Sequence, residues 1–331
     1  MTKAFVFGKF LPFHKGHEAM IRYANSISDQ VSVLICKSDT EEISALIRKH
    51  WIEGACADLP ALTVLTYEYR ERDLPNTSVA ARPVSRLWAK VFKRLLPDAQ
   101  VLVTSEPYGE MVAEFMNIRH VAFDSARMLF PVSASRINAD RISNWHFLPE
   151  TVKPFYAIKV VILGTESTGK TTLTQRLARH YGCSYVLEAA RHIIADSNHF
   201  EINDLYRVVD RHTHDIEKAC CGDHALVIID TNVLITESYA EFAFGEKLKV
   251  DDTVSRVNQA SLYLYLNNDV SYYQDGTRLS KEDRDRLDSS HRLVLTRYGI
   301  LPAEISGNWE ERFRDAVRRI DVLLKKYFHE I

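Results

Sequence analysis

The sequence has few of the features that would place a protein in a membrane, on nucleic acid or outside the cell. No apolar run reaches the length of a membrane-spanning helix. The first apolar stretch turns polar at Gly8 and Lys9, too early for the core of a signal peptide. The formal net charge is −2 with both signs interspersed, so no overall field attracts nucleic acid or an anionic membrane. We therefore expect no membrane, no nucleic-acid partner and no signal peptide.

Cysteine is scarce and unpatterned. The five cysteines, at positions 36, 56, 183, 220 and 221, form no C-x-x-C motif and no Cys/His spacing typical of a zinc site. An odd number of cysteines without such spacing favours reduced thiols over a disulfide framework. We expect a cytoplasmic protein without a zinc site.

The length and composition are those of a two-domain globular protein. The 331 residues exceed the usual size of one domain. The hydrophobic share of 46% and the charged share of 26% are ordinary for a soluble protein. We expect one domain over residues 1–147 and another over 159–331. The linker between them, residues 148–158, is expected to be stiff because it contains Pro149 and Pro154.

A phosphate-binding motif begins the second domain. After an apolar run at 160–163, residues 164–171 fit the pattern G-x-x-x-x-G-K-[ST] at every fixed position. Its glycines let the loop curl so that backbone N–H groups point inward, and the next helix presents its positive N-terminus. Lys170 would reach the β- and γ-phosphates of ATP, and Thr171 would hold Mg²⁺. The ATP contacts expected here are Gly164, Glu166, Ser167, Thr168, Gly169, Lys170, Thr171 and Thr172.

The first domain opens with another candidate phosphate site. An apolar run at 4–7 leads into Gly8, Phe10, His14, Gly16 and His17. The turn and the helix after it let both imidazoles and the helix N-terminus face one anion. The H-x-G-H motif alone is short enough to arise by chance. The longer string G-x-F-x-P-x-H-x-G-H resembles the signature of the nucleotidyltransferase superfamily, whose α/β domain binds ATP at these residues.

Strands and helices alternate through the first domain. Apolar runs at 31–36, 62–67, 101–104 and 120–123 are typical of buried strands, and stretches such as 79–95 are typical of helices. This alternation predicts a parallel, doubly wound sheet of the Rossmann-like class, which binds ligands at the carboxyl ends of its strands. The segment SEPYG that follows the fourth strand resembles one near the nucleotide pocket of the same superfamily.

A further signature of that superfamily, roughly I-S-x-T-x-x-R, is matched in part. Ser133 and Ser135 can cap a helix and hydrogen-bond to triphosphate oxygens. Asn138 occupies the position of the expected arginine, with Arg136 before it and Arg141 after it. We favour Arg136 as the replacement, because the first helical turn faces the anion. The alternative is a weakened phosphate clamp.

The second domain has further candidate residues beyond its phosphate loop. Glu188 and Arg191 follow a strand at 184–187, where they can grip a ribose and a phosphate or form a pair on a helix surface. A strand at 225–229 ends in Asp230, which is typical of the carboxylate that supports Mg²⁺.

A lid is predicted after the expected strand at 261–266. The stretch 274–278 ends in Arg278 and is followed by Lys281, Arg284 and Arg286. Arginines in the lids of small kinases close over the transferring phosphoryl group. A solvated charged helix is the alternative for these residues.

The pairing of these motifs resembles the bifunctional nicotinamide-nucleotide adenylyltransferase/ribosylnicotinamide kinase family, the NadR family, over nearly the whole chain. The shared motifs include the VKPF segment at 152–155, Glu166 in the phosphate loop, E-x-x-R at 188–191, IDT at 229–231 and D-G-x-R at 275–278. Asn138 and Asn232 depart from the family pattern. Some members carry an N-terminal helix-turn-helix domain. Here the first strand is expected at residue 4, so we expect no DNA-binding module.

The resemblance implies a Rossmann-like nucleotidyltransferase domain followed by a P-loop kinase domain. The kinase would phosphorylate nicotinamide riboside with ATP, giving nicotinamide mononucleotide. The transferase would join that product to AMP from a further ATP, giving NAD and pyrophosphate. It also implies Mg²⁺ as cofactor, the pyridine nucleotide near Trp51 and Trp88, and the catalytic residues His14, His17, Lys170, Glu188 and Asp230. Packing in the core is the alternative for both tryptophans.

Two other functions fit the same motifs. The kinase domain can serve another nucleoside or deoxynucleoside beside a related adenylyltransferase, because the residues that select the base are not assigned. The chain can also be a non-catalytic sensor of NAD or ATP, which the loss of an arginine at Asn138 would favour. The sequence leaves the oligomeric state open, a homo-oligomer included.

Overall fold

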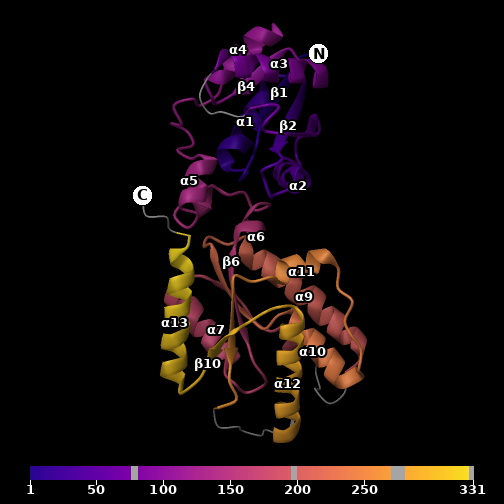
Figure 1. Cartoon of the computed structure of the whole chain (residues 1–331), viewed down its shortest axis with the longest axis vertical. Coiled ribbons are helices and arrows are strands. Elements are labelled where there is room, and N and C mark those ends of the chain that lie inside the picture. Colours follow the sequence, from indigo (N-terminus) through magenta and orange to yellow (C-terminus); the bar gives the residue numbers. More distant parts are fainter. Residues whose placement is uncertain (76–80, 195–199, 270–279, 328–331) are drawn as a thin grey trace. The chain divides into compact units, whose positions relative to one another are not determined.

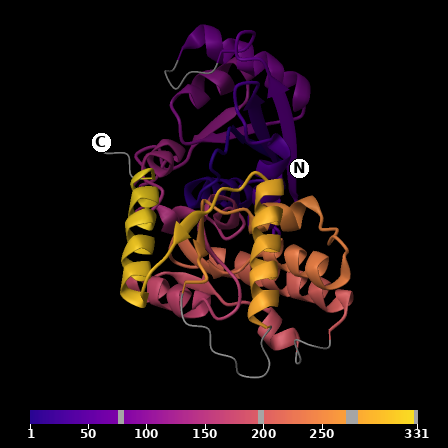
Figure 2. The ribbon, with the colours of Figure 1, turned by 60° about the horizontal axis from the view of Figure 1, so that its bottom comes forward.

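The computed structural model describes residues 1–75, 81–194, 200–269 and 280–327. The chain divides into two compact units, Met1–Val152 and Lys153–Ile331, here called unit 1 and unit 2 (Figure 1 and Figure 2). Each unit holds one five-stranded parallel sheet with helices around it. The predicted fold class is confirmed in both units. Within the described ranges, no helix has both the length and the apolar character needed to cross a membrane.

The sheet of unit 1 has the strand order β3-β2-β1-β4-β5. All its strand pairs are parallel, as expected for apolar strands joined by helical crossovers. The connections run toward one edge of the sheet from β1 and toward the other edge from β4. A crevice therefore opens between the carboxyl ends of these two strands. The strands are β1 (Lys3–Gly8), β2 (Gln30–Ser38), β3 (Leu62–Tyr69), β4 (Val101–Thr104) and β5 (Arg119–Ala122).

The helices of unit 1 begin where the sequence offers a cap or a proline. Ser44 accepts a hydrogen bond from the Ile47 N–H at the start of α2, and Pro83 stands in the first turn of α3, where its missing N–H costs nothing. The helices are α1 (Lys15–Ser26), α2 (Ala45–Ala55), α3 (Arg82–Leu95), α4 (Tyr108–Met116), α5 (Ala134–Ala139) and the 3₁₀ turn η1 (Trp145–Phe147).

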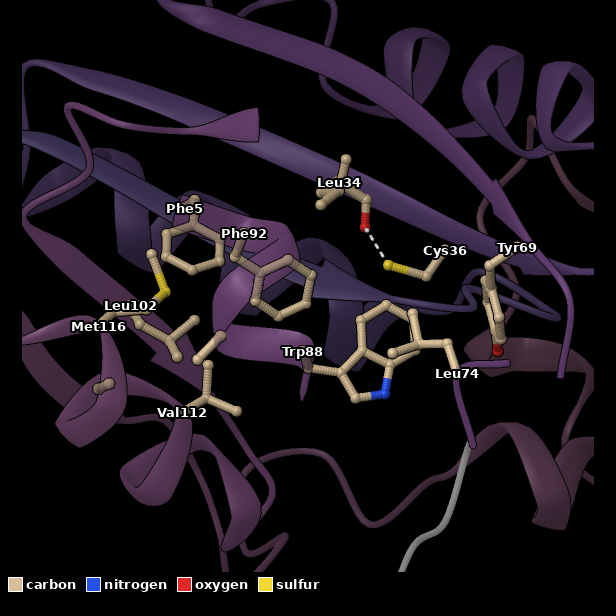
Figure 3. Close-up of a cluster of buried hydrophobic side chains, with 12 residues drawn as sticks. Phe5, Leu34, Cys36, Tyr69, Leu74, Trp88, Phe92, Leu102, Val112 and Met116 are labelled. Carbon is tan, nitrogen blue, oxygen red and sulfur yellow. Dashed lines mark hydrogen bonds between the residues drawn. The ribbon is translucent and has the colours of Figure 1, made fainter. Parts of the chain in front are cut away.

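The core of unit 1 forms where α3 and α4 cover one face of the sheet (Figure 3). Phe92 of α3 is fully buried, and its ring centre lies 5.6 Å from that of Phe5 and 4.4 Å from that of Phe7 on β1. Trp88, one helical turn earlier, packs against Phe92 with a centroid distance of 5.4 Å and the rings tilted by 35°. Burial of aromatic area at about 25 cal/mol per Å² holds the helix on the sheet.

The sheet of unit 2 has the order β10-β9-β6-β8-β7, again with every pair parallel. β6 lies in the centre and is buried along its whole length, as the apolar run at 160–163 predicts. The chain leaves β6 toward one edge of the sheet and leaves β9 toward the other edge, so the direction of the connections reverses between these two neighbouring strands. The strands are β6 (Ile158–Leu163), β7 (Ser184–Val186), β8 (Leu226–Asp230), β9 (Leu262–Leu266) and β10 (Ala303–Ile305).

Helices flank this sheet, with α13 packed beside α7 and α12 against α10 (Figure 1). The predicted helix after the phosphate loop begins at Lys170 and ends at Tyr181, as expected. The helices are α6 (Lys153–Tyr156), α7 (Lys170–Tyr181), α8 (Ala190–Ile193), α9 (Ile202–Cys220), α10 (Val233–Phe244), α11 (Asp252–Asn258), α12 (Lys281–Arg297) and α13 (Trp309–Lys325).

The predicted linker at 148–158 is packed into the units. Leu148 and Val152 are fully buried in unit 1, and the Thr151 hydroxyl donates to the Trp51 carbonyl oxygen at 2.9 Å. Lys153 begins α6 of unit 2, and its Nζ donates to carbonyl oxygens at the end of α9, including that of Cys221 at 3.1 Å. Leu148, Val152 and Lys153 thus find buried positions, which a free linker would not give them, whereas Phe155 is exposed.

Candidate nucleotide sites in the two units

A cavity of about 320 Å³ opens at the crevice of unit 1, between the carboxyl ends of β1 and β4. Its walls come from the turn after β1, the end of β4 and the loop that leads from β5 to α5. Six of the seven ATP-binding positions predicted for this unit line it, all except Arg136: Gly8, Phe10, His14, His17, Ser133 and Ser135. Segments more than a hundred residues apart in the chain therefore meet at one site.

The two histidines lie together at the start of α1. His14 is the N-cap residue, and its Nδ1 accepts a hydrogen bond from the His17 N–H at 3.3 Å. The two rings stack with a centroid distance of 3.6 Å and an interplanar angle of 20°. A Cβ on Gly16 would stand 3.1 Å from the His14 ring, so this glycine permits the close approach. The geometry confirms the predicted placement of His14 in the turn and His17 in the helix.

Both imidazoles are neutral near pH 7. Burial lowers the pKa of His14 to about 4, and the positive charge of Arg127 contributes. Burial also holds the pKa of His17 well below 6.5, with contributions from His14 and Arg127. Neutral imidazoles donate hydrogen bonds to phosphate oxygens but bring no positive charge to the cavity.

The second signature is built partly as predicted. Ser133 caps α5 by accepting a hydrogen bond from the Arg136 N–H at 3.1 Å. Asn138 lines the cavity, but Arg136, which we favoured as the replacement arginine, is exposed and does not. Its Nη1 donates to the Pro131 carbonyl oxygen at 2.9 Å, because the short helix turns this side chain outward. Arg141 is not among the residues that line the cavity either.

Sequence reasoning missed the arginine that does line the cavity, Arg127. It lies in the loop between β5 and α5 with a left-handed φ of 52°, and its Nη2 is 2.8 Å from Oε1 of Glu106. No motif marks this residue in the sequence. Its place depends on how the loop folds back over the cavity.

The two candidate tryptophans differ in their surroundings. Trp51 is 2% exposed in unit 1 and does not line the cavity that contains His14 and His17, which favours core packing. Trp88 borders a small cavity of about 70 Å³ that adjoins the larger one, since Gly8 and Tyr108 line both. Its Nε1 donates to the Pro75 carbonyl oxygen at 3.1 Å. Trp88 is therefore packed in the core and also borders the small cavity beside the site.

The phosphate loop of unit 2 has the tight backbone that its glycines predict. Gly164, Ser167 and Gly169 have φ values of 137°, 63° and 87°. A Cβ on Gly164 would stand 2.7 Å from the Leu266 carbonyl oxygen, and one on Gly169 would collide with the Trp309 ring. Both glycines are therefore required by conformation and by space.

Lys170 and the two predicted metal ligands meet at this loop. The Lys170 Nζ donates to the Thr165 carbonyl oxygen at 3.0 Å, inside the curl of the loop. The Thr171 hydroxyl donates to Oδ2 of Asp230 at 2.6 Å, and the Thr231 hydroxyl donates to Oδ1 at 3.2 Å. No group of three or more His, Cys, Asp or Glu side chains suited to a metal occurs in the described ranges. A hydroxyl beside one carboxylate nevertheless fits Mg²⁺, which is commonly held by one or two carboxylates together with substrate phosphates.

Glu188 and Arg191 face the same loop. The Arg191 Nη2 donates to the Thr171 hydroxyl oxygen at 3.0 Å, and its Nε lies 3.9 Å from the Glu188 carboxylate. Burial raises the pKa of Glu188, and the nearby Asp230 raises it further, whereas Lys170 opposes the shift. The pair therefore belongs to the site, and the alternative of an isolated pair on a helix surface does not describe it.

The predicted lid is only partly described. Arg278 and the stretch 274–278 lie outside the described residues. Arg284 is 3% exposed, and its Nε donates to the Thr165 hydroxyl at 3.2 Å. Arg284 is therefore neither a mobile lid arginine nor part of a solvated helix surface: it holds the start of the phosphate loop. Lys281 and Arg286 are exposed on α12.

A buried arginine of α13 supports the loop and was missed by sequence reasoning. Arg312 is 1% exposed and donates to the carbonyl oxygens of Thr168 and Asn267, each at 2.9 Å. It also pairs with the Asp269 carboxylate. One guanidinium thus ties the phosphate loop to the segment that follows β9.

The fold and the two sites define an α/β protein with a nucleotidyltransferase-like unit and a P-loop kinase-like unit. A family model described as an AAA domain matches residues 159–312, a range that contains the phosphate loop. The trifunctional NAD biosynthesis/regulator protein NadR of Escherichia coli is 24% identical over 318 residues, which cover 88% of this chain and 75% of the relative. Its counterpart in Salmonella typhimurium is 24% identical over 313 residues, covering 87% and 74%.

Two solved structures share the fold over the whole chain. A crystal structure of NadR protein in complex with NR aligns over 100% of this chain and 97% of its own, with a TM-score of 0.71 and 20% identity. A complex of NadR protein with NAD and AMP-PNP aligns over the same shares with a TM-score of 0.69 and 19% identity. The chain is thus a homologue of the NadR proteins, and the resemblance that its motifs indicated is confirmed.

Proposed function

We propose that the chain is a bifunctional enzyme of NAD biosynthesis. Unit 2 phosphorylates nicotinamide riboside with ATP, and unit 1 transfers the AMP moiety of ATP to the resulting mononucleotide, giving NAD and pyrophosphate. The observation that carries the proposal is the presence, in one chain related to NadR over 88% of its length, of a complete phosphate loop and an H-x-G-H cavity. The ligands named for the NadR structures, NR and NAD with AMP-PNP, fit these two reactions.

In unit 2 the 5′-hydroxyl oxygen of the riboside forms a bond to the γ-phosphorus as the bond to the bridging oxygen breaks, and ADP leaves. Lys170 and the N–H groups of the loop stabilise the charge on the phosphates. Of the two candidate bases we assign Glu188, which receives the hydroxyl proton. Asp230 already accepts hydrogen bonds from Thr171 and Thr231, whereas burial raises the pKa of Glu188 toward the working pH.

Mg²⁺ is the expected cofactor of this step. Thr171 and Asp230 are the residues that would hold it, because their hydroxyl and carboxylate oxygens are already within 2.6 Å of each other. When bound, it neutralises negative charge on the phosphates. Arg191 contacts the same hydroxyl at 3.0 Å and is placed to bind a phosphate or the riboside beside it.

In unit 1 a phosphate oxygen of the mononucleotide attacks the α-phosphorus of ATP, and pyrophosphate leaves. No base is required, because a phosphate monoester is already ionised at neutral pH. His14 and His17 donate hydrogen bonds as neutral imidazoles, while Ser133 and Ser135 line the same cavity. The N-terminus of the twelve-residue helix α1 adds a positive dipole at this point.

A product assay tests the proposal. The protein is incubated with Mg²⁺-ATP and nicotinamide riboside, and the products are separated by chromatography. We expect nicotinamide mononucleotide first and NAD afterwards, with pyrophosphate in equal amount to NAD. Parallel reactions with other nucleosides and deoxynucleosides test the alternative kinase function. Bound nucleotide without any turnover would support a sensor and contradict the proposal.

We further propose that the enzyme acts in the cytoplasm. All five cysteines are free thiols, as expected for a reducing compartment. Fractionation of the source cells followed by detection of the chain tests this assignment, and recovery with the membrane fraction would contradict it.

A further inference from the structure

We propose that Arg127 provides the positive charge that binds the triphosphate of ATP in unit 1, the role that the motif assigns to the position of Asn138. The inference rests on the proposed adenylyl transfer and names a binding residue within that site. Its starting observation is that Arg127 lines the cavity that also contains His14, His17 and Asn138.

The loop holds Arg127 in place through its backbone. The carboxylate of Asp124 accepts N–H hydrogen bonds from Met128 at 2.7 Å, Leu129 at 3.1 Å and Phe130 at 3.0 Å. The Arg127 N–H donates to the Asp124 carbonyl oxygen at 2.7 Å. These bonds close a tight turn in which Arg127 takes a left-handed φ of 52°. A turn so closely hydrogen-bonded presents its side chain in a restricted set of directions.

The guanidinium has donors left for a phosphate. Its Nη2 is 2.8 Å from the Glu106 carboxylate, which also lines the cavity, and its side chain is 44% exposed. Since a guanidinium carries five N–H donors, one contact to Glu106 leaves others for phosphate oxygens. Without Arg127, the Glu106 carboxylate would repel the phosphates of ATP, because both are negatively charged. Arg127 therefore also offsets a negative charge that borders the cavity.

The other candidates fit this role less well. His14 and His17 are neutral, because burial and Arg127 itself lower the pKa of both. Lys9 also lines the cavity and pairs with Glu41 at 2.9 Å, but its ammonium lacks the planar fork with which a guanidinium binds phosphate oxygens. Arg136 points to the Pro131 carbonyl oxygen. Arg127 is therefore the arginine that borders the site in the described part of unit 1.

Position 138, in helix α5, borders the same cavity. Asn138 lines the cavity, and its Nδ2 lies 3.4 Å from the Leu11 carbonyl oxygen in the turn before His14. An arginine at either position, 127 or 138, can therefore bring its charge to the same ligand. This geometry explains how the motif can lose its arginine while the site keeps a cation.

The first experiment compares Arg127→Asn with Arg136→Ala in the full chain. Asparagine removes the charge while tolerating the left-handed backbone. With mononucleotide saturating, we expect Arg127→Asn to lower kcat/KM for ATP in adenylyl transfer by on the order of 10- to 100-fold, the effect of losing one or two charge-assisted contacts. KM for the mononucleotide and the riboside kinase activity of unit 2 should stay unchanged. Arg136→Ala serves as the matched control and should leave ATP kinetics within about threefold of wild type.

The second experiment asks whether position 138 can replace Arg127. We expect kcat/KM for ATP to be at least tenfold higher in the double variant Arg127→Asn/Asn138→Arg than in Arg127→Asn. Arg127→Lys should be intermediate, because it keeps the charge but loses the planar fork. A merely structural role for Arg127 would not be rescued by charge at another position.

The outcomes separate this inference from the proposed function. Unchanged ATP kinetics in Arg127→Asn, or a loss that also raises KM for the mononucleotide and is not rescued at position 138, would overturn the role of Arg127. Absence of NAD formation by the wild-type chain with supplied mononucleotide would instead overturn the adenylyltransferase proposal itself.

Discussion

His14 combines a structural role with its place in the cavity of unit 1. Its Nδ1 accepts the hydrogen bond that starts α1, and its ring stacks on His17. Protonation would remove that acceptor and would place a cation against a buried neighbour. The helix start and the phosphate site therefore depend on the same neutral imidazole.

This arrangement predicts a loss of stability in acid. Burial lowers the folded-state pKa of His14 to about 4 from an ordinary value of 6.5. Between these values the unfolded chain binds a proton that the folded chain does not. The free energy of unfolding therefore has its highest value above pH 6.5 and decreases as the pH falls toward 4. The shift corresponds to about 3 kcal/mol.

Urea unfolding at several pH values measures this decrease. In a Trp309→Phe background the remaining tryptophans, Trp51, Trp88 and Trp145, all lie in unit 1 and report its unfolding. His14→Asn keeps a capping side chain but does not titrate, so it should show a smaller decrease between pH 6.5 and 4. An identical pH dependence in both proteins would contradict the assignment to His14.

At the scale of elements, the phosphate loop is held by neighbours from both sides. Arg284 of α12 binds the Thr165 hydroxyl, and Arg312 of α13 binds the Thr168 carbonyl oxygen. Trp309 covers Gly169. The loop keeps its phosphate-binding curl because helices distant in sequence hold its two ends.

Removing the Arg312 guanidinium should destabilise unit 2. Arg312→Met leaves buried carbonyl oxygens of Thr168 and Asn267 without donors, so we expect unfolding to become easier by about 2–4 kcal/mol and KM of the kinase for ATP to rise. Chemical denaturation and kinase assays measure the two effects. Arg314→Met, an exposed arginine on the same helix, is the matched control and should change stability by less than about 0.5 kcal/mol. Equal effects of the two variants would rule out a special role for Arg312.

Trp309 should report nucleotide binding in unit 2. It is the sole tryptophan of residues 153–331, its side chain is 51% exposed, and its ring lies on Gly169 of the phosphate loop. Since bound nucleotide changes the surroundings of that ring, AMP-PNP should change the tryptophan emission. The change should disappear in Trp309→Phe and weaken at the same nucleotide concentration in Lys170→Ala. A signal that persists in Trp309→Phe would come from unit 1 and would contradict the assignment.

At the scale of the whole molecule, each unit has its own sheet, core and candidate site. Lys170→Ala should therefore abolish phosphorylation of the riboside and leave adenylyl transfer to supplied mononucleotide largely intact. His17→Ala should lower adenylyl transfer by on the order of 10²- to 10³-fold, the loss on removing one transition-state donor, and spare the kinase. Separate assays of both reactions check this division.

A mixture of the two variants gives the sharper test. Neither Lys170→Ala nor His17→Ala should make appreciable NAD from riboside alone. Mixed together, they should make it after a lag, because mononucleotide released by one variant is the substrate of the other. If both reactions are lost in each variant while the protein remains folded, the division into two independent sites is wrong.

The sequence by itself determined the features that depend on short-range chemistry. The phosphate loop, the H-x-G-H turn and the Ser133 cap each act through residues within a few positions, so their spacing alone predicts their geometry. The apolar run at 160–163 in β6 could be recognised in the sequence, because a central parallel strand is buried on both faces. The three-residue strand β10 is too short to show such a pattern and was not predicted.

Only the tertiary structure decided which charged side chains belong to the sites. Arg127 and Arg312 have no recognisable spacing, and Arg284 stood in a segment that suggested another role. Contacts such as that between Arg312 and Thr168 cross 144 residues of chain. Arg136 lies in the expected motif yet turns outward, because helix α5 is only six residues long and its cap directs the first turn. An arginine has the same chemistry in every loop, so its role depends on what the folded chain places around its guanidinium.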